Sequence, residues 1–238
     1  MSVEIIGAPP RKGKTYWATR KALKSMEKKH NKRLENQKAR LKNPDIPVYT
    51  GQVFTNYPVF HPTLGYTKVW EEGFEEMPIF DSDIYIDESH RYYNSRKIKN
   101  FTSEMHDFFA WSGQRGNNVV LITHDPGRVD TIIREICECF RFARNWSLFG
   151  RPIIFFIDSY LSEDEYKQRH TGTRYSMDWF LFSKKVAKSY DTHFFRNEPE
   201  EKPYYKDWME RYGLKEPQMT TIRDYLKKCL FRVKSYWT

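Results

Sequence analysis

Short apolar runs alternate with longer polar stretches along most of this chain. The first run holds Val3, Ile5 and Ile6 and predicts a buried strand, after which a loop leads into a polar segment of helix-forming composition. Later runs at residues 48–54, 66–70, 83–87, 119–124, 140–149 and 152–157 predict further strands, and the run at 119–124 is apolar enough to be buried on both faces. This alternation predicts the α/β fold class, with a mainly parallel sheet and helices on both of its faces.

Helix-forming composition or helical spacing marks four segments, at residues 16–42, 102–111, 126–138 and 222–233, while residues 158–173 are predicted to form a polar loop. The first segment is strongly basic and carries only a thin apolar stripe. Its first turns are therefore expected to pack on the sheet, and the rest to project into solvent as far as Asn43 and Pro44. The projecting arm is either a solvated face or a contact for nucleic acid or phospholipid.

The loop after the first strand ends in the tripeptide Gly13-Lys14-Thr15, and a helix is expected to follow. Strand, loop, Gly-Lys-Thr and helix together are the setting of a phosphate loop, in which backbone N–H groups at a helix N-terminus face the phosphates of ATP. Lys14 is expected to reach the β- and γ-phosphates, and the Thr15 hydroxyl to ligate Mg²⁺. The expected nucleotide contacts are Gly7, Ala8, Pro9, Pro10, Arg11, Lys12, Gly13, Lys14 and Thr15. Ala8 stands where the pattern usually has its first glycine, and the two prolines stiffen the turn.

A second candidate group follows the apolar run at residues 83–87, where Asp87 and Glu88 are adjacent. Downstream of a phosphate loop, an aspartate at a strand tip is expected to contact the Mg²⁺ shell, and the next glutamate to act as general base for the attacking water. Asp81 and Asp83 come before the apolar residues of this strand, which start at Ile84, and are interpreted as edge charges. His90, which is expected to start a helix, is interpreted as structural.

The apolar run at residues 119–124 ends in Thr123 and His124. If this strand lies between the two motif strands, one of these side chains is expected to point at the γ-phosphate of ATP. The alternative for His124 is a capping or loop role, because Asp125 and Pro126 begin the next predicted helix.

The net charge of the chain indicates which kind of partner it is expected to bind. The chain has 238 residues and a formal net charge of +9, which favours a polyanionic partner, either nucleic acid or an anionic membrane surface; lysine added for solubility is the other interpretation. The N-terminus lacks a basic-then-apolar signal sequence, and no apolar run approaches the roughly 18 residues of a membrane helix. The expected location is therefore intracellular.

The ordered set of motifs resembles the zonular occludens toxin-like family, which includes the filamentous-phage assembly ATPases and is related to the FtsK–HerA class of DNA-pumping motors. The shared features are the phosphate loop, the Asp-Glu strand followed by Ser-His-Arg, a Gln-Arg loop, an apolar strand ending in Thr-His, an arginine-bearing helix and a late Tyr-Asp-Thr. The resemblance covers about residues 2–195. It implies a P-loop ATPase domain at 1–195 and a small C-terminal helical extension at 196–238.

The resemblance assigns the phosphate loop, the Asp-Glu pair and the Thr-His strand tip the roles given above. It adds Arg115, in the Gln-Arg loop, as a candidate arginine finger acting catalytically on a neighbouring subunit of a homo-oligomeric ring. Arg128 and Arg134 are rivals for that role.

The activity that the resemblance implies is ATP hydrolysis, with ATP and Mg²⁺, that powers virion morphogenesis by translocating or packaging viral DNA. The implied partners are viral DNA, further copies of the chain, capsid or assembly-complex proteins, and an anionic membrane; the implied location is the host cytoplasm or the virion. Phage-assembly members of the family usually continue into a membrane helix and an outer domain, whereas this sequence ends at Thr238. The alternative is a nucleotide-switched virion assembly or extrusion scaffold without DNA-motor activity, that is, a membrane-associated phage export ATPase lacking its anchor.

Overall fold

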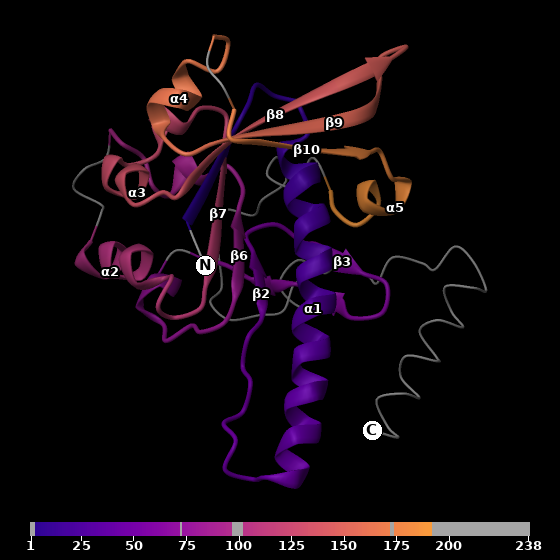
Figure 1. Cartoon of the computed structure of the whole chain (residues 1–238), viewed down its shortest axis with the longest axis vertical. Helices are drawn as coiled ribbons and strands as arrows, with labels where there is room; N and C mark the ends of the chain where they lie inside the picture. The colour runs from indigo at the N-terminus through magenta and orange to yellow at the C-terminus, as the bar shows by residue number, and fades with distance from the viewer. Residues whose placement is uncertain (1–2, 72, 97–101, 172–173, 192–238) are drawn as a thin grey trace, which may run out of the picture.

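One eight-stranded sheet organises the computed structural model, which describes residues 3–71, 73–96, 102–171 and 174–191 (Figure 1). The strands are β1 (Val3–Gly7), β2 (Val53–Thr55), β5 (Lys68–Val69), β6 (Asp83–Ile86), β7 (Asn118–Thr123), β8 (Cys139–Leu148), β9 (Arg151–Tyr160) and β10 (Ser176–Leu181), and a separate two-stranded sheet pairs β3 (Phe60–His61) with β4 (Gly65–Tyr66). The helices are α1 (Lys14–Lys42), α2 (Ser103–Trp111), α3 (Thr131–Glu135), α4 (Glu163–Lys167) and α5 (Lys184–Ala187), with 3-10 helices η1 (Phe74–Glu76), η2 (Ser89–Arg91) and η4 (Pro126–Arg128).

The strand order is β10-β9-β8-β1-β7-β6-β2-β5. All pairs from β8 to β5 are parallel, whereas β8 with β9 and β9 with β10 are antiparallel, so the predicted mainly parallel sheet is confirmed. Strand β7 lies between β1 and β6, the two strands that carry the motifs. Because these strands run the same way, their carboxyl ends meet at one edge of the sheet.

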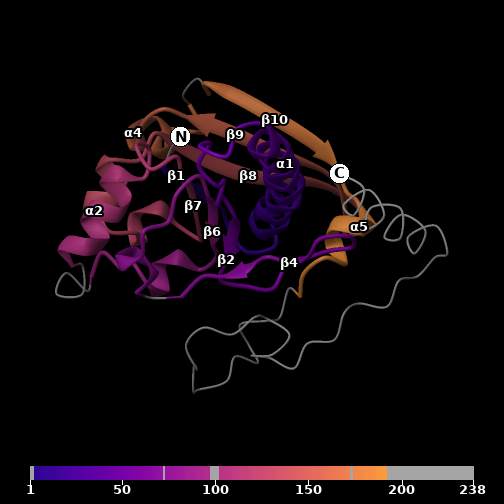
Figure 2. The same ribbon diagram turned by 90° about the horizontal axis from the view of Figure 1, so that it is seen from below.

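Helices cover both faces of the sheet, as predicted. Figure 2 shows α1 on one face and α2 and α4 on the other, with β1, β7, β6 and β2 between them. Each side has its own buried cluster, one containing Trp17 and Tyr57 and the other containing Phe108, Phe109 and Phe140. The central strands β1 and β7 supply apolar residues to both clusters, which is why their sequences read as continuous apolar runs.

Helix α1 is 29 residues long, and its buried residues lie almost entirely in the first half. Trp17, Ala22 and Met26 are buried against the sheet, and the last turns extend past it (Figure 1). The helix ends at Lys42 with Asn43 in an extended conformation. The predicted boundary and the predicted cationic projection are both confirmed.

Two predicted elements are shorter than expected. In the region of the run at 48–54 the strand is only Val53–Thr55, because the Tyr49 N–H donates to the Asn36 side chain at 3.0 Å and so does not pair with another strand. The helix predicted at 126–138 breaks into η4 and α3. Between them Val129 is extended, and the Asp130 side chain accepts from the Ile132 N–H at 2.9 Å to start the second helix.

Asp83 is not the edge charge that its position predicted. It is 6% exposed, and its carboxylate lies 3.6 Å from Lys29 Nζ and accepts from Asn118 Nδ2 at 2.6 Å. A carboxylate at an internal strand needs such partners, and α1 passes close enough to supply the cation. Asp81, in contrast, is partly exposed and lies 3.8 Å from Lys32.

The prediction of a polar loop at 158–173 is also partly wrong, because β9 continues to Tyr160 by pairing with β8, and α4 follows β9.

The predicted helix at 222–233 and the extension at 196–238 lie outside the described residues. Within the part of the chain that the structure describes, no helix has both the length and the hydropathy to cross a bilayer.

Candidate nucleotide-binding site

The loop between β1 and α1 has the backbone of an anion cradle. Gly13, the residue before α1, has φ 93°, and a Cβ there would overlap the Phe155 ring, so the position requires glycine. No side chain caps the first turn of α1, which leaves its N–H groups and the positive end of the helix dipole for a ligand. Arg11, with φ 62°, and Lys12 are exposed on the same loop, whereas Ala8 is buried.

Lys14 is folded back onto this loop. Its ammonium group donates to the carbonyl oxygens of Ala8 at 2.7 Å and Pro9 at 3.2 Å, and lies 3.3 Å from His124 Nδ1. Burial lowers the pKa of Lys14, although the charges of Asp87 and Glu88 act to raise it. The Lys14 ammonium group therefore lies at the loop that would bind the phosphates, and a nucleotide would replace the two carbonyl oxygens that it now contacts.

Thr15 and Asp87 meet where a metal contact was predicted. The Thr15 hydroxyl donates to Asp87 Oδ2 at 2.7 Å, and Asp87 Oδ1 accepts from the Glu88 N–H at 2.8 Å. Asn56, just after β2, fixes the Asp87 backbone from both sides, donating to its carbonyl at 2.8 Å and accepting from its N–H at 2.7 Å. Burial raises the pKa of Asp87 to about 6. A hydroxyl and a carboxylate whose charge is only partly compensated fit Mg²⁺, which takes oxygen ligands and keeps several waters.

The Glu88 carboxylate lies close to two histidines. Glu88 has φ 49°, and its carboxylate lies 3.1 Å from His124 Nε2 and 3.4 Å from His90 Nδ1. Because His124 Nδ1 faces the Lys14 ammonium and accepts from it, the ring proton is placed on Nε2, which lies on the side of Glu88. Burial lowers the pKa of His90. A polar chain of side chains therefore lies at the sheet edge, in the order Lys14, His124, Glu88 and His90, although Glu88 Oε2 and His90 Nδ1 have no hydrogen-bond partner among the described residues.

Of the two residues at the tip of β7, only His124 reaches this chain. The Thr123 hydroxyl donates to the Asp125 carbonyl at 3.1 Å and accepts from the Asp125 N–H at 3.3 Å. Thr123 therefore closes the turn after the strand. The imidazole of His124 lies between the candidate phosphate-binding lysine and the candidate base.

The three arginines proposed as fingers lie in different places. The Arg115 carbonyl accepts from the Asp81 N–H at 2.9 Å before β6 and β7 begin, so Arg115 lies at the opposite edge of the sheet from the phosphate loop. Arg134 is bound to Glu163, with Nη1 2.6 Å from Oε1. Arg128 is exposed at the end of η4, directly after β7. The role of Arg115 stays a prediction about a neighbouring subunit.

Asn56 and His90 were missed as site residues. Asn56 follows the three-residue strand β2, and the sequence pattern indicates only that it belongs to the exit from the predicted strand at 48–54. His90 was interpreted as structural, yet it lies beside Glu88. Its closeness in sequence to the Asp-Glu pair was the available signal.

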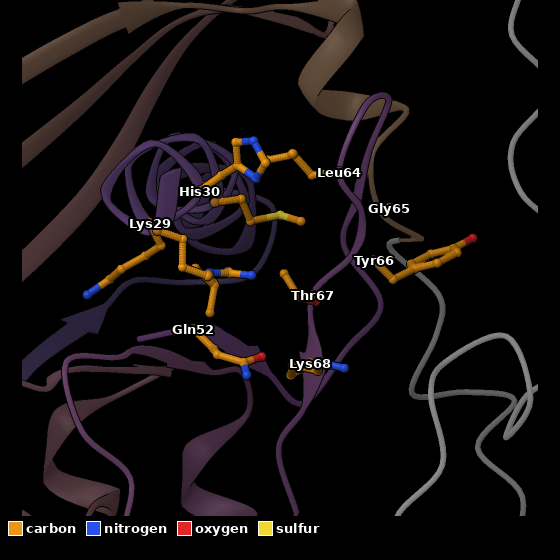
Figure 3. A pocket seen from close by; sticks show the side chains of 11 residues that line it. Lys29, His30, Gln52, Leu64, Gly65, Tyr66, Thr67 and Lys68 are labelled. Carbon is orange, nitrogen blue, oxygen red and sulfur yellow. The ribbon is translucent and has the colours of Figure 1, made fainter. Parts of the chain in front are cut away.

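A cavity of about 360 Å³ lies elsewhere, between the middle of α1 and the segment around β4 and β5 (Figure 3). It contains basic residues, but the ammonium group of Lys29 turns toward Asp83 and the Asp81 carbonyl. The cavity borders the amino end of β2 and includes no residue of the phosphate loop. It is not part of the candidate nucleotide site.

The phosphate loop opening a helix, the Thr15–Asp87 contact, and a strand inserted between the two motif strands define the chain as a P-loop NTPase by fold. The family is equally plain: the model for the zonular occludens toxin (Zot) family matches residues 3–151, and the chain belongs to that family. The predicted resemblance is confirmed.

Several solved structures are similar to this chain. The N-terminal domain of zonular occludens toxin from Neisseria meningitidis is 14% identical, with a TM-score of 0.49 over 80% of this chain and 98% of that one. The genome packaging NTPase B204 from Sulfolobus turreted icosahedral virus 2, in complex with AMPPCP, is 9% identical, with a TM-score of 0.44 over 79% and 94%. The flagellar accessory protein FlaH from Methanocaldococcus jannaschii is 12% identical, with a TM-score of 0.40 over 75% and 84%. A search of curated proteins found no match.

Proposed function

We propose that this protein hydrolyses ATP with Mg²⁺ and uses the energy in virion assembly, by translocating or packaging viral DNA. The observation that carries the proposal is the gathering of Lys14, Thr15, Asp87 and Glu88 at the carboxyl edge of β1 and β6. Membership of the zonular occludens toxin family supports the viral setting, through the motifs shared with phage-assembly ATPases.

Each residue has a distinct task in the proposed reaction. Lys14 leaves the loop carbonyls and binds the β- and γ-phosphates, while the backbone N–H groups at the start of α1 hold the same oxygens. Thr15 and Asp87 would hold Mg²⁺, which would neutralise phosphate charge. Glu88 orients and deprotonates the attacking water, and His124 positions the Glu88 carboxylate.

Charge supports DNA as the polymer that is moved. The net charge of +9 and the basic projecting half of α1 favour a polyanion. A ring of subunits lets an arginine from one copy stabilise charge on the γ-phosphate of its neighbour, an effect worth roughly 10³–10⁵ in rate. Arg134 is bound to Glu163, whereas Arg115 and the exposed Arg128 form no ion pair within the described residues and are the two better candidates.

The decisive assay is the steady-state ATPase rate with no DNA, with single-stranded DNA and with double-stranded DNA, for wild type and Glu88→Gln. Loss of the base is expected to lower the rate about 10²- to 10⁴-fold and to abolish DNA stimulation. Glu104→Gln, an exposed glutamate on α2, is the matched control and is expected to keep the wild-type rate. A wild-type rate retained in Glu88→Gln would overturn the assigned base.

A nucleotide-switched scaffold is the second candidate, and the closed polar chain favours it. Lys14 is bound to its own loop, and Glu88 lies beside His124 and His90, so a nucleotide must displace the Lys14 contacts before its phosphates can bind. In this reading, ATP opens the contacts and orders an interface, and turnover is slow. A flat, slow ATPase rate without DNA response, together with ATP-dependent association in analytical ultracentrifugation, would favour the scaffold over the motor.

A further inference from the structure

One face of the antiparallel strands β8, β9 and β10 carries aromatic side chains in neighbouring positions. In the strand register Arg144 is opposite Phe156, and Phe156 is opposite Trp179, so the three side chains lie side by side on one face. The adjacent residues Phe155 and Phe180 lie on the other face, where both stack with Tyr16 of α1. The row therefore belongs to the face that α1 does not cover.

The next row along the same face is also apolar. It contains Trp146, Ile154 and Leu181, again as cross-strand neighbours. Trp146 is 51% exposed and Trp179 is 62% exposed. Large aromatic side chains that stay exposed on a sheet face indicate a binding surface.

An arginine-rich hollow of about 610 Å³ adjoins the first row, lined by Phe142, Arg144, Asp158, Tyr160, Arg169, His170 and Arg174. It contains three arginines and one carboxylate. Asp158 accepts from Arg144 at 2.7 Å and from Arg174 at 3.2 Å, so positive charge remains in excess. The Arg144 guanidinium lies 4.7 Å from the centre of the Phe156 ring, which keeps its plane fixed beside the aromatic row.

We infer that this surface, the hollow and the two rows of β8–β10, binds single-stranded DNA. Arginines in the hollow bind the phosphates, and unpaired bases stack on Trp179, Phe156 and Trp146. Aromatic faces next to a basic groove are the means by which proteins bind single strands with little sequence preference. In a duplex the bases are already stacked and paired, so the aromatic rows add nothing to its binding. The inference rests on the proposed function in that DNA is taken as the polymer.

The surface also lies next to the phosphate loop. Phe142 pairs in register with Gly7, the last residue of β1, and Tyr166 packs on Phe142 with ring centres 6.0 Å apart. A Cβ on Gly7 would overlap the Tyr166 hydroxyl, so these two residues touch only because position 7 is glycine. Arg169, which lines the hollow, lies 5.0 Å from the Tyr166 ring centre. A DNA single strand bound in the hollow would therefore be separated from the start of the phosphate loop only by the Tyr166 side chain.

Fluorescence anisotropy with a dye-labelled oligo-dT of 20 nucleotides tests the inference on the full chain. Trp179→Ala is expected to weaken binding about ten-fold, the loss of one stacked base. Arg174→Gln is expected to weaken binding and to reduce the slope of log affinity against log salt by about 0.7. The matched controls are Trp111→Ala, an exposed tryptophan on α2, and Lys68→Gln, an exposed lysine on β5 at the opposite edge of the sheet from β10; both are expected to bind within two-fold of wild type.

Three results would overturn the inference. They are equal affinities for Trp179→Ala and Trp111→Ala, tighter binding of a 20-base-pair duplex than of the single strand, or binding of phosphatidylglycerol vesicles that depends on Trp179 without binding of the oligonucleotide. Circular dichroism melts of each variant show whether a lost signal reflects unfolding, and Trp179→Phe, which keeps a ring, is expected to restore binding. The ATPase rate without DNA is measured in parallel. Strand binding without ATPase would defeat the proposed function alone, and ATPase without strand binding would defeat this inference alone.

Discussion

The buried negative charge of Asp87 is expected to lower the free energy of unfolding of the nucleotide-free protein by a measurable amount. The Asp87 carboxylate accepts from the Thr15 hydroxyl and from the Glu88 N–H, and the nearest cation, Lys14, lowers its pKa less than burial raises it. Asp87→Asn removes the charge and keeps the shape. The amide oxygen still accepts from the Glu88 N–H, and the amide nitrogen donates to the Thr15 hydroxyl, which can reverse its role. We therefore expect the variant to be more stable than wild type at neutral pH.

The size of the effect follows from the pKa. Burial raises the pKa of Asp87 from its ordinary value of 3.8 to about 6, and at about 1.4 kcal/mol per pKa unit this corresponds to about 3 kcal/mol. Between these two values the folded state binds more protons than the unfolded state, so wild-type stability falls as the pH rises through this range. The advantage of Asp87→Asn is expected to be absent below about pH 4 and complete, at about 3 kcal/mol, above about pH 6.

Urea unfolding of wild type and Asp87→Asn at pH 4, 5, 6 and 8, without nucleotide, measures this difference directly. Asp83→Asn is the control, because its carboxylate lies 3.6 Å from Lys29 and its loss leaves that cation without its partner. The control is expected to be less stable than wild type at pH 8. Equal stability of wild type and Asp87→Asn at pH 8, or a difference that grows as the pH falls, would refute the reasoning.

Three further outcomes follow from local geometry. Gly7→Ala is expected to lower the free energy of unfolding by about 2 kcal/mol, because the new Cβ overlaps the Tyr166 hydroxyl, and Tyr166→Phe in the same chain should recover part of the loss in urea titrations. Phe149→Asn is expected to raise stability by about 1 kcal/mol, seen as a higher Tm, since Phe149 is 95% exposed with φ 49° and asparagine suits that turn; an unchanged Tm would contradict this. Glu4→Gln is expected to cost about 2 kcal/mol, because the Glu4 carboxylate accepts from Arg141 at 2.8 and 2.9 Å. Burial acts to raise the pKa of Glu4 but Arg141 outweighs it, so this contribution is present above pH 4.5, the ordinary value, and should fade in unfolding curves as the pH falls below it.

The sequence allows the central part of the fold to be predicted because its signals are local. The apolar runs of β1 and β7, the Gly13-Lys14-Thr15 tripeptide and the Asn43 boundary each lie within a few neighbouring residues. Parallel strands then bring their carboxyl ends to a common edge, so the approach of Thr15 to Asp87 follows from the order of motifs.

The features that the sequence did not predict depend on contacts between distant segments. Nothing near Asp83 indicates that Lys29, 54 positions earlier, will neutralise it. The choice between Thr123 and His124 is decided by which side chain turns back to bond Asp125, which the order of residues does not show. The aromatic rows of β8–β10 arise from antiparallel register, and a shift of one residue would have moved each of those side chains to the face of α1.

In the free site the Lys14 ammonium group is bonded to two carbonyl oxygens of its own loop, so on reaching a phosphate it exchanges one set of polar partners for another. Glu88 lies beside His124 and His90, but within the described residues its Oε2 atom has no hydrogen-bond partner, so an approaching water replaces no bond at that atom. Asp87 differs, because its charge has no full compensation in the free chain and a divalent cation supplies it. In the proposed function, relief of this buried charge is therefore a source of net binding free energy, and Asp87→Asn should gain stability when free and lose most of the stabilisation that Mg²⁺ with ATP gives to wild type.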